Sequence, residues 1–191
     1  MSSVFQKIFF IIIFTIFSSN LIKAQPRKGE FINVAAGIGL TSPYDDTDID
    51  GTGFYAQGEY VFGLTKWIGL RPYAGLILTS TDQNSNQQNQ PEYKVTTNAF
   101  LIGGKARICA PIPWVAPYIE IGVGASIGSF ETYTPLTTIK KNGLLMHVPF
   151  SIGLALGRKN NFDVAFTYYY TSAADQFSGA AAVGFTFPMK W

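Results

Sequence analysis

Apolar residues recur at every second position in eight segments of this chain, and no other feature of the sequence limits its fold as strongly. In residues 116–127, Ile119 and Ile121 share one face of an extended strand, whereas Tyr118 and Glu120 share the other. Successive side chains of a β-strand point to opposite faces, so this alternation predicts strands that are apolar on one side. The predicted strands are residues 29–40, 53–62, 67–78, 94–108, 116–127, 145–156, 162–171 and 178–191.

The connections between these segments alternate in length, which predicts an up-and-down antiparallel arrangement. Short turns at one end and long loops at the other are typical of eight-stranded transmembrane β-barrels, whose turns face the periplasm and whose loops face outward. Ten to twelve residues at ~3.3 Å each, tilted by about 45°, cover the ~25 Å apolar band of an outer membrane. The long connections are residues 41–52, 79–93 and 128–144, the short ones are 63–66 and 157–161, residues 109–115 are of moderate length, and residues 172–177 form the last connection.

The composition indicates which strand face meets lipid. Charged residues make up 14% of the chain, well below the roughly 25% that is usual for soluble domains. After residue 24 no apolar stretch reaches the ~20 residues of a membrane-spanning helix, so a membrane protein of this composition would cross with strands. The less apolar strand faces consist mostly of Gly, Ala, Ser, Thr and Tyr, whereas the exterior of a soluble barrel is typically about 25 to 35% charged. We therefore expect the apolar faces to point outward into lipid.

The amino-terminal residues have the pattern of a secretory signal peptide. Lys7 precedes an apolar run, residues 8–17, and the small residue Ala24 marks a cleavage point. The run is too short for a membrane-spanning helix, which disfavours the alternative of an anchor. We expect residues 1–24 to be the signal and residues 25–191 to be the barrel. The single cysteine, Cys109, excludes an internal disulfide and predicts an inert thiol.

The carboxyl-terminal segment resembles the last strand of outer-membrane β-barrels. In that family an aromatic residue closes the strand, apolar residues precede it at every second position, and the barrel-assembly machinery reads this signal. The residues that match are Phe185, Phe187, Met189 and Trp191. The chain as a whole is similar to the small OmpA/OmpX-like, porin-family barrels of Gram-negative bacteria. This resemblance implies an outer-membrane location, contact with membrane lipid and lipopolysaccharide, and a structural or surface role rather than catalysis; we also expect a monomer.

Six charged residues fall on the inward faces, three of each sign, and each lies within about six residues of a short turn. An eight-stranded barrel leaves a lumen just wide enough for side chains. We therefore predict that these charges form one layer of salt bridges that plugs the lumen near the periplasm; the alternative is that they line an open pore. The six residues are Glu59, Arg71, Lys105, Arg107, Glu120 and Asp163.

Two prolines interrupt the predicted strands. Pro72 and Pro149 lack the backbone N–H that a strand ladder uses, and a closed barrel has no edge at which to place them. We expect bulges or late strand starts at both positions.

An acidic segment in the first loop suggests a weak calcium site. Asp46, Asp48 and Asp50 alternate before Gly51, as in the opening half of a calcium-binding loop. Gln57 stands where the closing glutamate of an EF-hand would be, so an EF-hand is excluded and the alternative is a solvated acidic loop. No other cofactor is expected.

Three functional classes remain open, and nucleic-acid binding is not among them. The chain has 14 Lys and Arg and 12 Asp and Glu; residues 1–24 hold two of the basic residues and no acidic one, so the rest is neutral. The first class is a surface-interaction protein that uses its external loops, and the second is a narrow channel for small solutes. The third loop offers contacts through Phe130, Tyr133, Leu136, Lys140 and Lys141; room for a channel would come from Gly37, Gly39, Gly75, Gly103, Gly122, Gly124 and Gly153.

The third class is a lipid-modifying enzyme. Lipid A deacylases of this general type place a His and a Ser two residues apart on the lipid side, but Pro149 occupies that position relative to His147. Ser151 lies about 13 Å away along the strand, too far for a hydrogen bond. We expect His147 to face the lumen and to bond neighbouring hydroxyl groups, and we expect no enzymatic activity.

Overall fold

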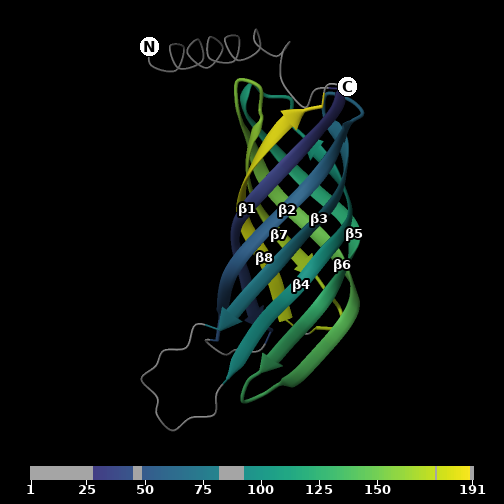
Figure 1. Ribbon diagram of the computed structural model, residues 1–191. Helices are drawn as coiled ribbons and strands as arrows, with labels where there is room; N and C mark the ends of the chain where they lie inside the picture. The colour runs from purple at the N-terminus through teal and green to yellow at the C-terminus, as the bar shows by residue number, and fades with distance from the viewer. Residues whose placement is uncertain (1–27, 45–48, 82–92, 175, 190–191) are drawn as a thin grey trace, which may run out of the picture.

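The computed structural model describes residues 28–44, 49–81, 93–174 and 176–189, which form a closed β-barrel of eight strands (Figure 1). Within these residues no helix is long and apolar enough to cross a membrane. The strands are β1 (Gly29–Pro43), β2 (Gly51–Gly63), β3 (Ile68–Thr81), β4 (Lys94–Cys109), β5 (Trp114–Tyr133), β6 (Thr138–Gly157), β7 (Phe162–Tyr170) and β8 (Gln176–Pro188).

Each strand runs antiparallel to the next one along the chain, and β8 closes the barrel by pairing with β1. That closing register runs from Phe31 opposite Pro188 to Pro43 opposite Gln176. The predicted eight-stranded antiparallel barrel is therefore confirmed. The turns after β2, β4 and β6 lie at one end, at the top of Figure 1, which we call the short-turn end; the opposite end is the loop end.

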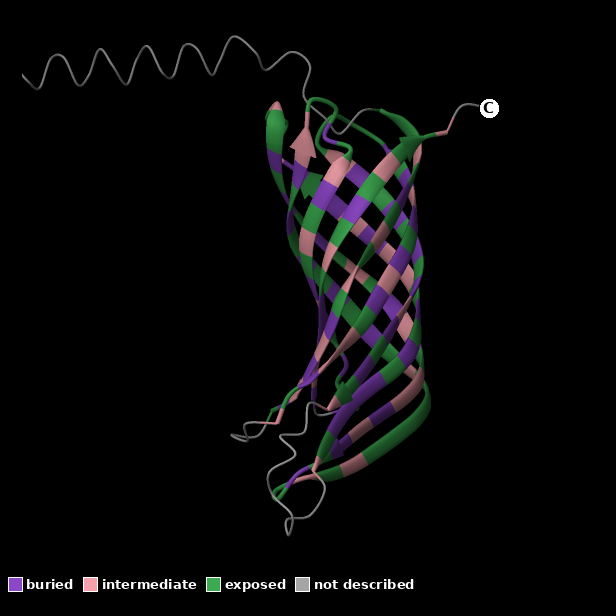
Figure 2. Ribbon diagram, turned by 60° about the vertical axis from the view of Figure 1, so that its left-hand side comes forward, coloured by how far each residue is buried: buried purple, intermediate pink, exposed green. Residues whose placement is uncertain are grey.

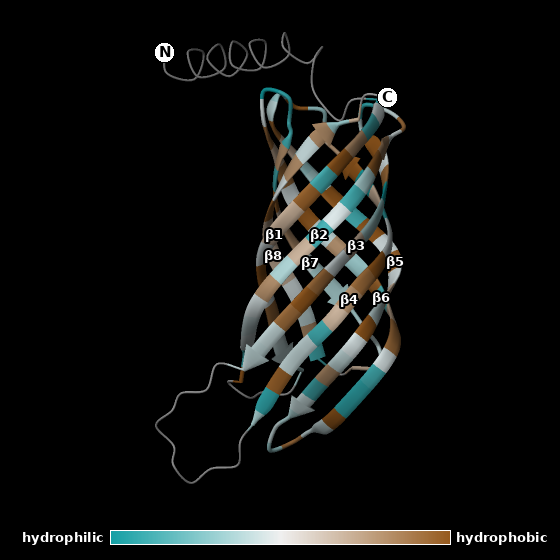
Figure 3. Cartoon of the chain, viewed as in Figure 1, coloured by the Kyte–Doolittle hydropathy of each residue, from teal (hydrophilic) through white to brown (hydrophobic). Residues whose placement is uncertain are grey.

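Buried and exposed residues alternate through most of the barrel wall (Figure 2), as the period of two requires; residues 138–146 of β6 are the main exception, since none of them is buried. In β5, for example, Ile121 is 60% exposed and its inward neighbour Glu120 is 2% exposed. Hydropathy alternates in the same way, and most outward positions in the middle of the barrel are apolar (Figure 3). The barrel thus carries its polar side chains inside and its apolar side chains outside, the reverse of a soluble protein.

The third long loop expected from the sequence, residues 128–144, is instead a continuation of the sheet. β5 and β6 stay paired from Trp114 opposite Gly157 to Tyr133 opposite Thr138, and β4 follows β5 as far as Lys94 opposite Tyr133. The prediction was wrong because polar residues replace apolar ones at the outward positions here, while the alternation itself persists. The connection between the two strands is only residues 134–137.

The two prolines interrupt pairing without shifting the register. Residues 60 and 61 of β2 pair with β1 but have no partner on β3 beside Pro72, although β3 keeps its pairing with β4 at Pro72 and Gly104. Residues 122 and 123 of β5 pair with β4 but have no partner on β6 beside Pro149, which stays opposite Tyr169 on β7. The expected bulges and late starts are absent from these two strands, because each proline disturbs only one of its two ladders.

Candidate functional site

The six inward charges predicted from the sequence meet inside the barrel near its short-turn end. They are Glu59 on β2, Arg71 on β3, Lys105 and Arg107 on β4, Glu120 on β5 and Asp163 on β7. We call this set the charge layer. None of its side chains is more than 8% exposed, and the predicted pairing between opposite signs is present.

Two like charges lie directly opposite each other within this layer, and two carboxylates hold them there. Arg71 on β3 pairs in register with Lys105 on β4, an arrangement that is unfavourable on its own. Glu59 accepts from Arg71 Nη1 at 2.6 Å and contacts Lys105 Nζ at 2.7 Å. Glu120 contacts the same two groups from the other side, at 3.4 Å and 2.8 Å. Each carboxylate therefore bridges both cations, and neither cation is left uncompensated.

Arg107 links the layer across the lumen. Its Nε donates to Glu120 Oε1 at 2.5 Å, and its Nη1 donates to Asp163 Oδ1 on β7 at 2.8 Å. The guanidinium carbon lies 3.5 Å from the ring centroid of Tyr118, within the range of a cation–π interaction. Because β4 and β7 are not neighbours in the sheet, this residue connects opposite parts of the wall.

Three neutral residues that the sequence did not assign to the charge layer complete it. Asn33 on β1 donates to Asp163 Oδ2 at 2.8 Å, and Thr186 on β8 donates to the same oxygen at 3.3 Å. Gln57 donates to Glu59 Oε1 at 2.6 Å. The only sequence signal for these residues is their inward position on a strand, and many other polar residues share it.

A second layer of aromatic and hydroxyl groups lies next to the charges on the loop side. His147 faces the lumen as predicted: its Nε2 is 2.5 Å from the Tyr73 hydroxyl and its Nδ1 is 2.6 Å from the Ser126 hydroxyl. The hydroxyls of Tyr55 and Tyr169 are 2.8 Å apart. His147 is 2% exposed, so within the described chain it is enclosed by its partners.

Aromatic rings from other positions fill the space that a side chain would occupy at two of the inward glycines. A side chain at Gly124 would collide with the Tyr73 hydroxyl and with His147 Nε2, and one at Gly153 would lie 2.5 Å from the Tyr118 ring. The room that suggested a channel is thus occupied by aromatic side chains at these positions. Small residues on one strand and large rings on the next are how a narrow barrel fills its interior.

Two further layers fill the lumen toward the loop end. The first is apolar and includes Ile77, Leu101 and Phe130, each at most 2% exposed. Phe130 was expected in an external loop, but it points into the barrel because β5 continues past it. The last layer is polar and centres on Gln176, which donates to Thr97 Oγ1 at 2.6 Å and accepts from Thr132 at 2.7 Å.

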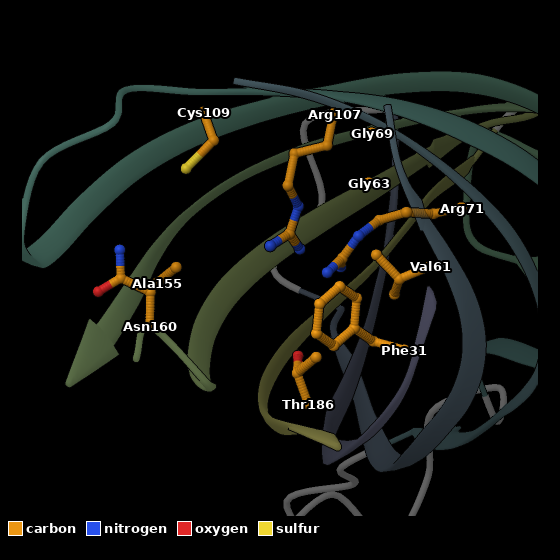
Figure 4. Close-up of a pocket in the computed structure, with 10 residues that line it drawn as sticks. All are labelled: Phe31, Val61, Gly63, Gly69, Arg71, Arg107, Cys109, Ala155, Asn160 and Thr186. Carbon is orange, nitrogen blue, oxygen red and sulfur yellow. The ribbon is translucent and has the colours of Figure 1, made fainter. Parts of the chain in front are cut away.

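A small pocket lies between the charge layer and the short-turn end (Figure 4). The guanidinium groups of Arg71 and Arg107 converge on it, and Thr186, Phe31 and Asn160 lie at its edge. Its volume is about 40 Å³, which is room for a few water molecules. The pocket therefore offers room for water at the short-turn end of a filled lumen.

At the loop end, β5 and β6 project beyond the neighbouring strand and form what we call the β5–β6 hairpin. β6 pairs with β7 only between Val148 and Leu156, so among the described residues the segment from Thr138 to His147 has a strand partner on one side alone. The part of β6 nearest the loop end is hydrophilic, in contrast to the barrel wall (Figure 3, lower right). Tyr133 and the turn residue Leu136 are exposed at the tip.

Glu131 ties this hairpin to β4. It is 2.6 Å from Lys140 Nζ on β6 and 2.9 Å from Lys94 Nζ on β4. Hydrogen bonds from Lys140 and Lys94 lower the pKa of the Glu131 carboxyl to about 2. Lys141 is exposed on the same strand, so the described basic residues here outnumber the acidic ones.

The calcium hypothesis stays a prediction. Asp46 and Asp48 lie outside the described residues, and Asp50 is exposed just before β2. Gln57 points into the lumen and bonds to Glu59 and Tyr55, which agrees with its exclusion as a calcium ligand. The residues that the structure describes contain no group of three His, Cys, Asp or Glu side chains able to hold a metal ion.

Exposed aromatic residues lie on the outer face of β8 and near the short turns. Phe185 and Phe187 are exposed on the outer face of β8; Met189 donates its N–H to the Glu30 carbonyl, and Trp191 lies outside the described residues. The exposed aromatics near the short turns include Phe62, Trp67 and Trp114. Whether the assembly machinery reads β8 stays a prediction.

Comparison with known proteins shows the fold. No family model matches the chain, and no curated protein matches it. The crystal structure of Neisserial surface protein A, a protein of Neisseria, has a TM-score of 0.58 at 13% identity, covering 85% of this chain and 98% of that one. The outer membrane protein OprG from Pseudomonas aeruginosa has a TM-score of 0.52 at 11% identity, covering 88% and 100%. The chain therefore has the fold of small outer-membrane barrels, as its sequence resemblance implied.

Proposed function

We propose that this chain is exported and inserted into the outer membrane of a Gram-negative bacterium, where it is a plugged scaffold with a surface-interaction role. The observation that carries this is the inverted distribution of polarity. Aliphatic and aromatic side chains cover the outside of the strands, and the charge layer is enclosed within. In lipid the part of the barrel where all eight strands pair with both neighbours leaves no unpaired sheet edge, whereas in water its apolar surface would be a large exposed patch.

The filled lumen favours a scaffold over a channel. Four successive layers occupy the interior between the two ends, and the charge layer is internally neutral, with three residues of each sign. Purified protein in a planar lipid bilayer should show no steady conductance. A stable open current would instead support the narrow channel.

The interior also favours a non-catalytic role. The single histidine of the chain is held between Tyr73 and Ser126 inside the barrel, away from lipid and from either mouth. A buried imidazole with both nitrogens engaged has no free position from which to act on a lipid substrate. Incubation with lipid A or phospholipid should therefore release no acyl chain.

The β5–β6 hairpin is the part that the proposed surface interaction uses. It presents the strand edge that begins at Thr138, together with Tyr133 and Leu136 at the tip. Unpaired strand edges are ready templates for another chain. The register allows a clean test, because Gly128 and Gly143 lie directly opposite each other. Replacing residues 129–142 by Asn-Gly would join these two positions with a two-residue turn. The change also removes Phe130 and Thr132 from the lumen layers and the β5 partner of residues 94–98, so the variant must first be shown to fold.

Cells that display this shortened variant at the same surface level as the wild type should adhere less to one another and to a mammalian cell monolayer. Equal adhesion of both would remove the hairpin from the proposal. Folding of the shortened variant is checked by electrophoresis, in which a folded barrel changes its mobility when it is heated.

A further inference from the structure

The charges of this barrel are unevenly distributed between its two ends. The short-turn end carries Lys28, Lys66, Arg158 and Lys159 against a single acid, Glu30. In sequence, the connections β1–β2, β3–β4 and β7–β8 at the other end contain Asp45, Asp46, Asp48, Asp50, Asp82, Glu92 and Asp175 and no basic residue. We call the four basic side chains at the short-turn end the basic rim.

The basic rim is free to bind anions. All four side chains are exposed, and among the residues that the structure places none of them forms an ion pair. The only acid beside them, Glu30, already accepts a hydrogen bond from the Tyr60 hydroxyl at 2.7 Å. The rim charge is therefore uncompensated within the described chain, unlike the neutral charge layer a short distance inside.

The turns that carry the rim are held in place by local hydrogen bonds. Thr65 Oγ1 accepts from the backbone N–H groups of Trp67 and Ile68, at 3.2 Å and 2.9 Å, which fixes the turn containing Lys66. Asn160 adopts a positive φ of 47°, its N–H bonds the Gly157 carbonyl, and its side chain donates to the Ile112 carbonyl at 3.3 Å. This second set links the turn of Arg158 and Lys159 to the turn before β5. Three of the four rim cations, Lys66, Arg158 and Lys159, are thus carried by turns that local hydrogen bonds hold.

Exposed aromatics place the rim at the membrane surface. Trp67, 51% exposed, follows Lys66 directly, and Trp114, 61% exposed, lies opposite Gly157, the residue before Arg158. Trp side chains gather at the level of lipid headgroups in barrels of this type. The cations next to them therefore lie at the level of the phosphates. They also occur at three separate places around the barrel: before β1, between β2 and β3, and between β6 and β7.

We propose that the basic rim binds anionic phospholipid headgroups of the leaflet that surrounds the short-turn end. This rests on the proposed membrane location. Cations spread around a ring of aromatics fit an annulus of lipid phosphates better than a single compact partner, which would need them on one patch. Each basic side chain near an anionic membrane surface favours association by about fivefold at low salt.

The test compares two variants of the full-length barrel that lose the same charge at opposite ends. The first is Lys66→Gln with Arg158→Gln and Lys159→Gln; the matched control is Lys94→Gln with Lys140→Gln and Lys141→Gln. Each protein is reconstituted into phosphatidylcholine, and spin-labelled phosphatidylglycerol and phosphatidylcholine report the relative association constant by electron paramagnetic resonance. The wild type and the control should prefer phosphatidylglycerol, and the rim variant should lose at least about fivefold of that preference. In 0.5 M salt the preference should fall toward unity in all three.

The proposal is overturned if the wild type shows no preference or if both variants lose it equally. A wild type that binds purified peptidoglycan through the rim without any preference for phosphatidylglycerol would also overturn it and assign the rim to the cell wall. Failure of the protein to insert into either lipid would instead count against the proposed membrane location. Insertion without lipid preference leaves that location standing and removes only the rim proposal.

Discussion

Arg107 and Glu120 lie directly opposite one another on β4 and β5, and the Arg107 Nε donates to Glu120 Oε1 at 2.5 Å. Glu120 also contacts Lys105 at 2.8 Å and Arg71 at 3.4 Å. One carboxylate thus contacts all three cations of the charge layer. The cohesion of that layer should depend on this residue more than on any other of its members.

Replacing Glu120 by Gln should destabilise the barrel by about 3 to 5 kcal/mol, because three buried cations would lose a shared counter-charge. The measurement is urea-induced unfolding of protein folded into lipid vesicles. Glu131→Gln is the matched control, since that carboxylate pairs with lysines that are largely exposed, and it should cost less than about 1 kcal/mol. A Glu120→Gln variant as stable as this control would mean that the charge layer contributes little to the plug.

Two glycines on adjacent strands should respond in opposite ways to valine. A Cβ at Gly124 would collide with Tyr73 and His147 in the lumen, whereas one at Gly104 on the outer face would meet nothing within 4 Å. Gly124→Val should therefore cost about 1 to 3 kcal/mol or prevent folding, because the overpacked interior has no space to relax. Gly104→Val should fold normally, since valine suits a strand. The same urea titration compares the two, and equal tolerance would contradict the packed second layer.

Acid should loosen the β5–β6 hairpin before it affects the barrel. The pKa of Glu131 is lowered to about 2 by Lys140 and Lys94. Because the folded-state pKa lies below the unfolded one of about 4.5, the stabilisation is fully present above pH 4.5 and is lost as the pH falls toward 2. Amide hydrogen exchange near Tyr133 should accelerate across this range at low salt, and the Glu131→Gln variant should show no such change. Exchange that is independent of pH in the wild type, after correction for intrinsic rates, would show that the ion pairs do not hold the hairpin.

A charge introduced on the outer face should destabilise the barrel only at positions that contact lipid. Ile121→Arg places a guanidinium on the apolar surface of β5 and should reduce stability in vesicles by roughly 2 to 4 kcal/mol. Leu136→Arg makes the same type of change at the tip of the hairpin, outside the expected membrane band, and should cost little. Equal small effects at both positions would mean that the outer face is not in contact with lipid.

The strands and the charge layer could be predicted from the sequence because both depend on local alternation. Once Glu59 and Glu120 are placed on the same face as Arg71, a closed barrel of eight strands has too little room to keep them apart. Asn33 and Thr186 could not be singled out, because neutral polar residues on an inward face are common and only the three-dimensional register brings them to Asp163.

The β5–β6 hairpin was missed for a different physical reason. Outward positions such as Ser129 and Glu131 are polar, so the apolar signal of a strand stops although the hydrogen-bonded ladder continues. An outward polar residue is expected once a strand leaves the bilayer, so the change in composition marks the edge of the membrane rather than the end of the strand. The effect of Pro72 and Pro149 was also misjudged, since each strand has two neighbours and one intact ladder preserved the register.

The central claim is that the outer face of the barrel contacts lipid, and spin-label accessibility tests it most directly. Single cysteines at positions 38, 121 and 152, in a chain with Cys109→Ala, would carry a nitroxide label on outward positions of β1, β5 and β6, with position 136 at the hairpin tip as the aqueous control. For protein folded into lipid vesicles, collision with oxygen should exceed collision with a water-soluble nickel chelate at the first three positions, and the order should reverse at the tip. Nickel accessibility at positions 38, 121 and 152 equal to that at the tip would contradict the orientation and, with it, the proposed function.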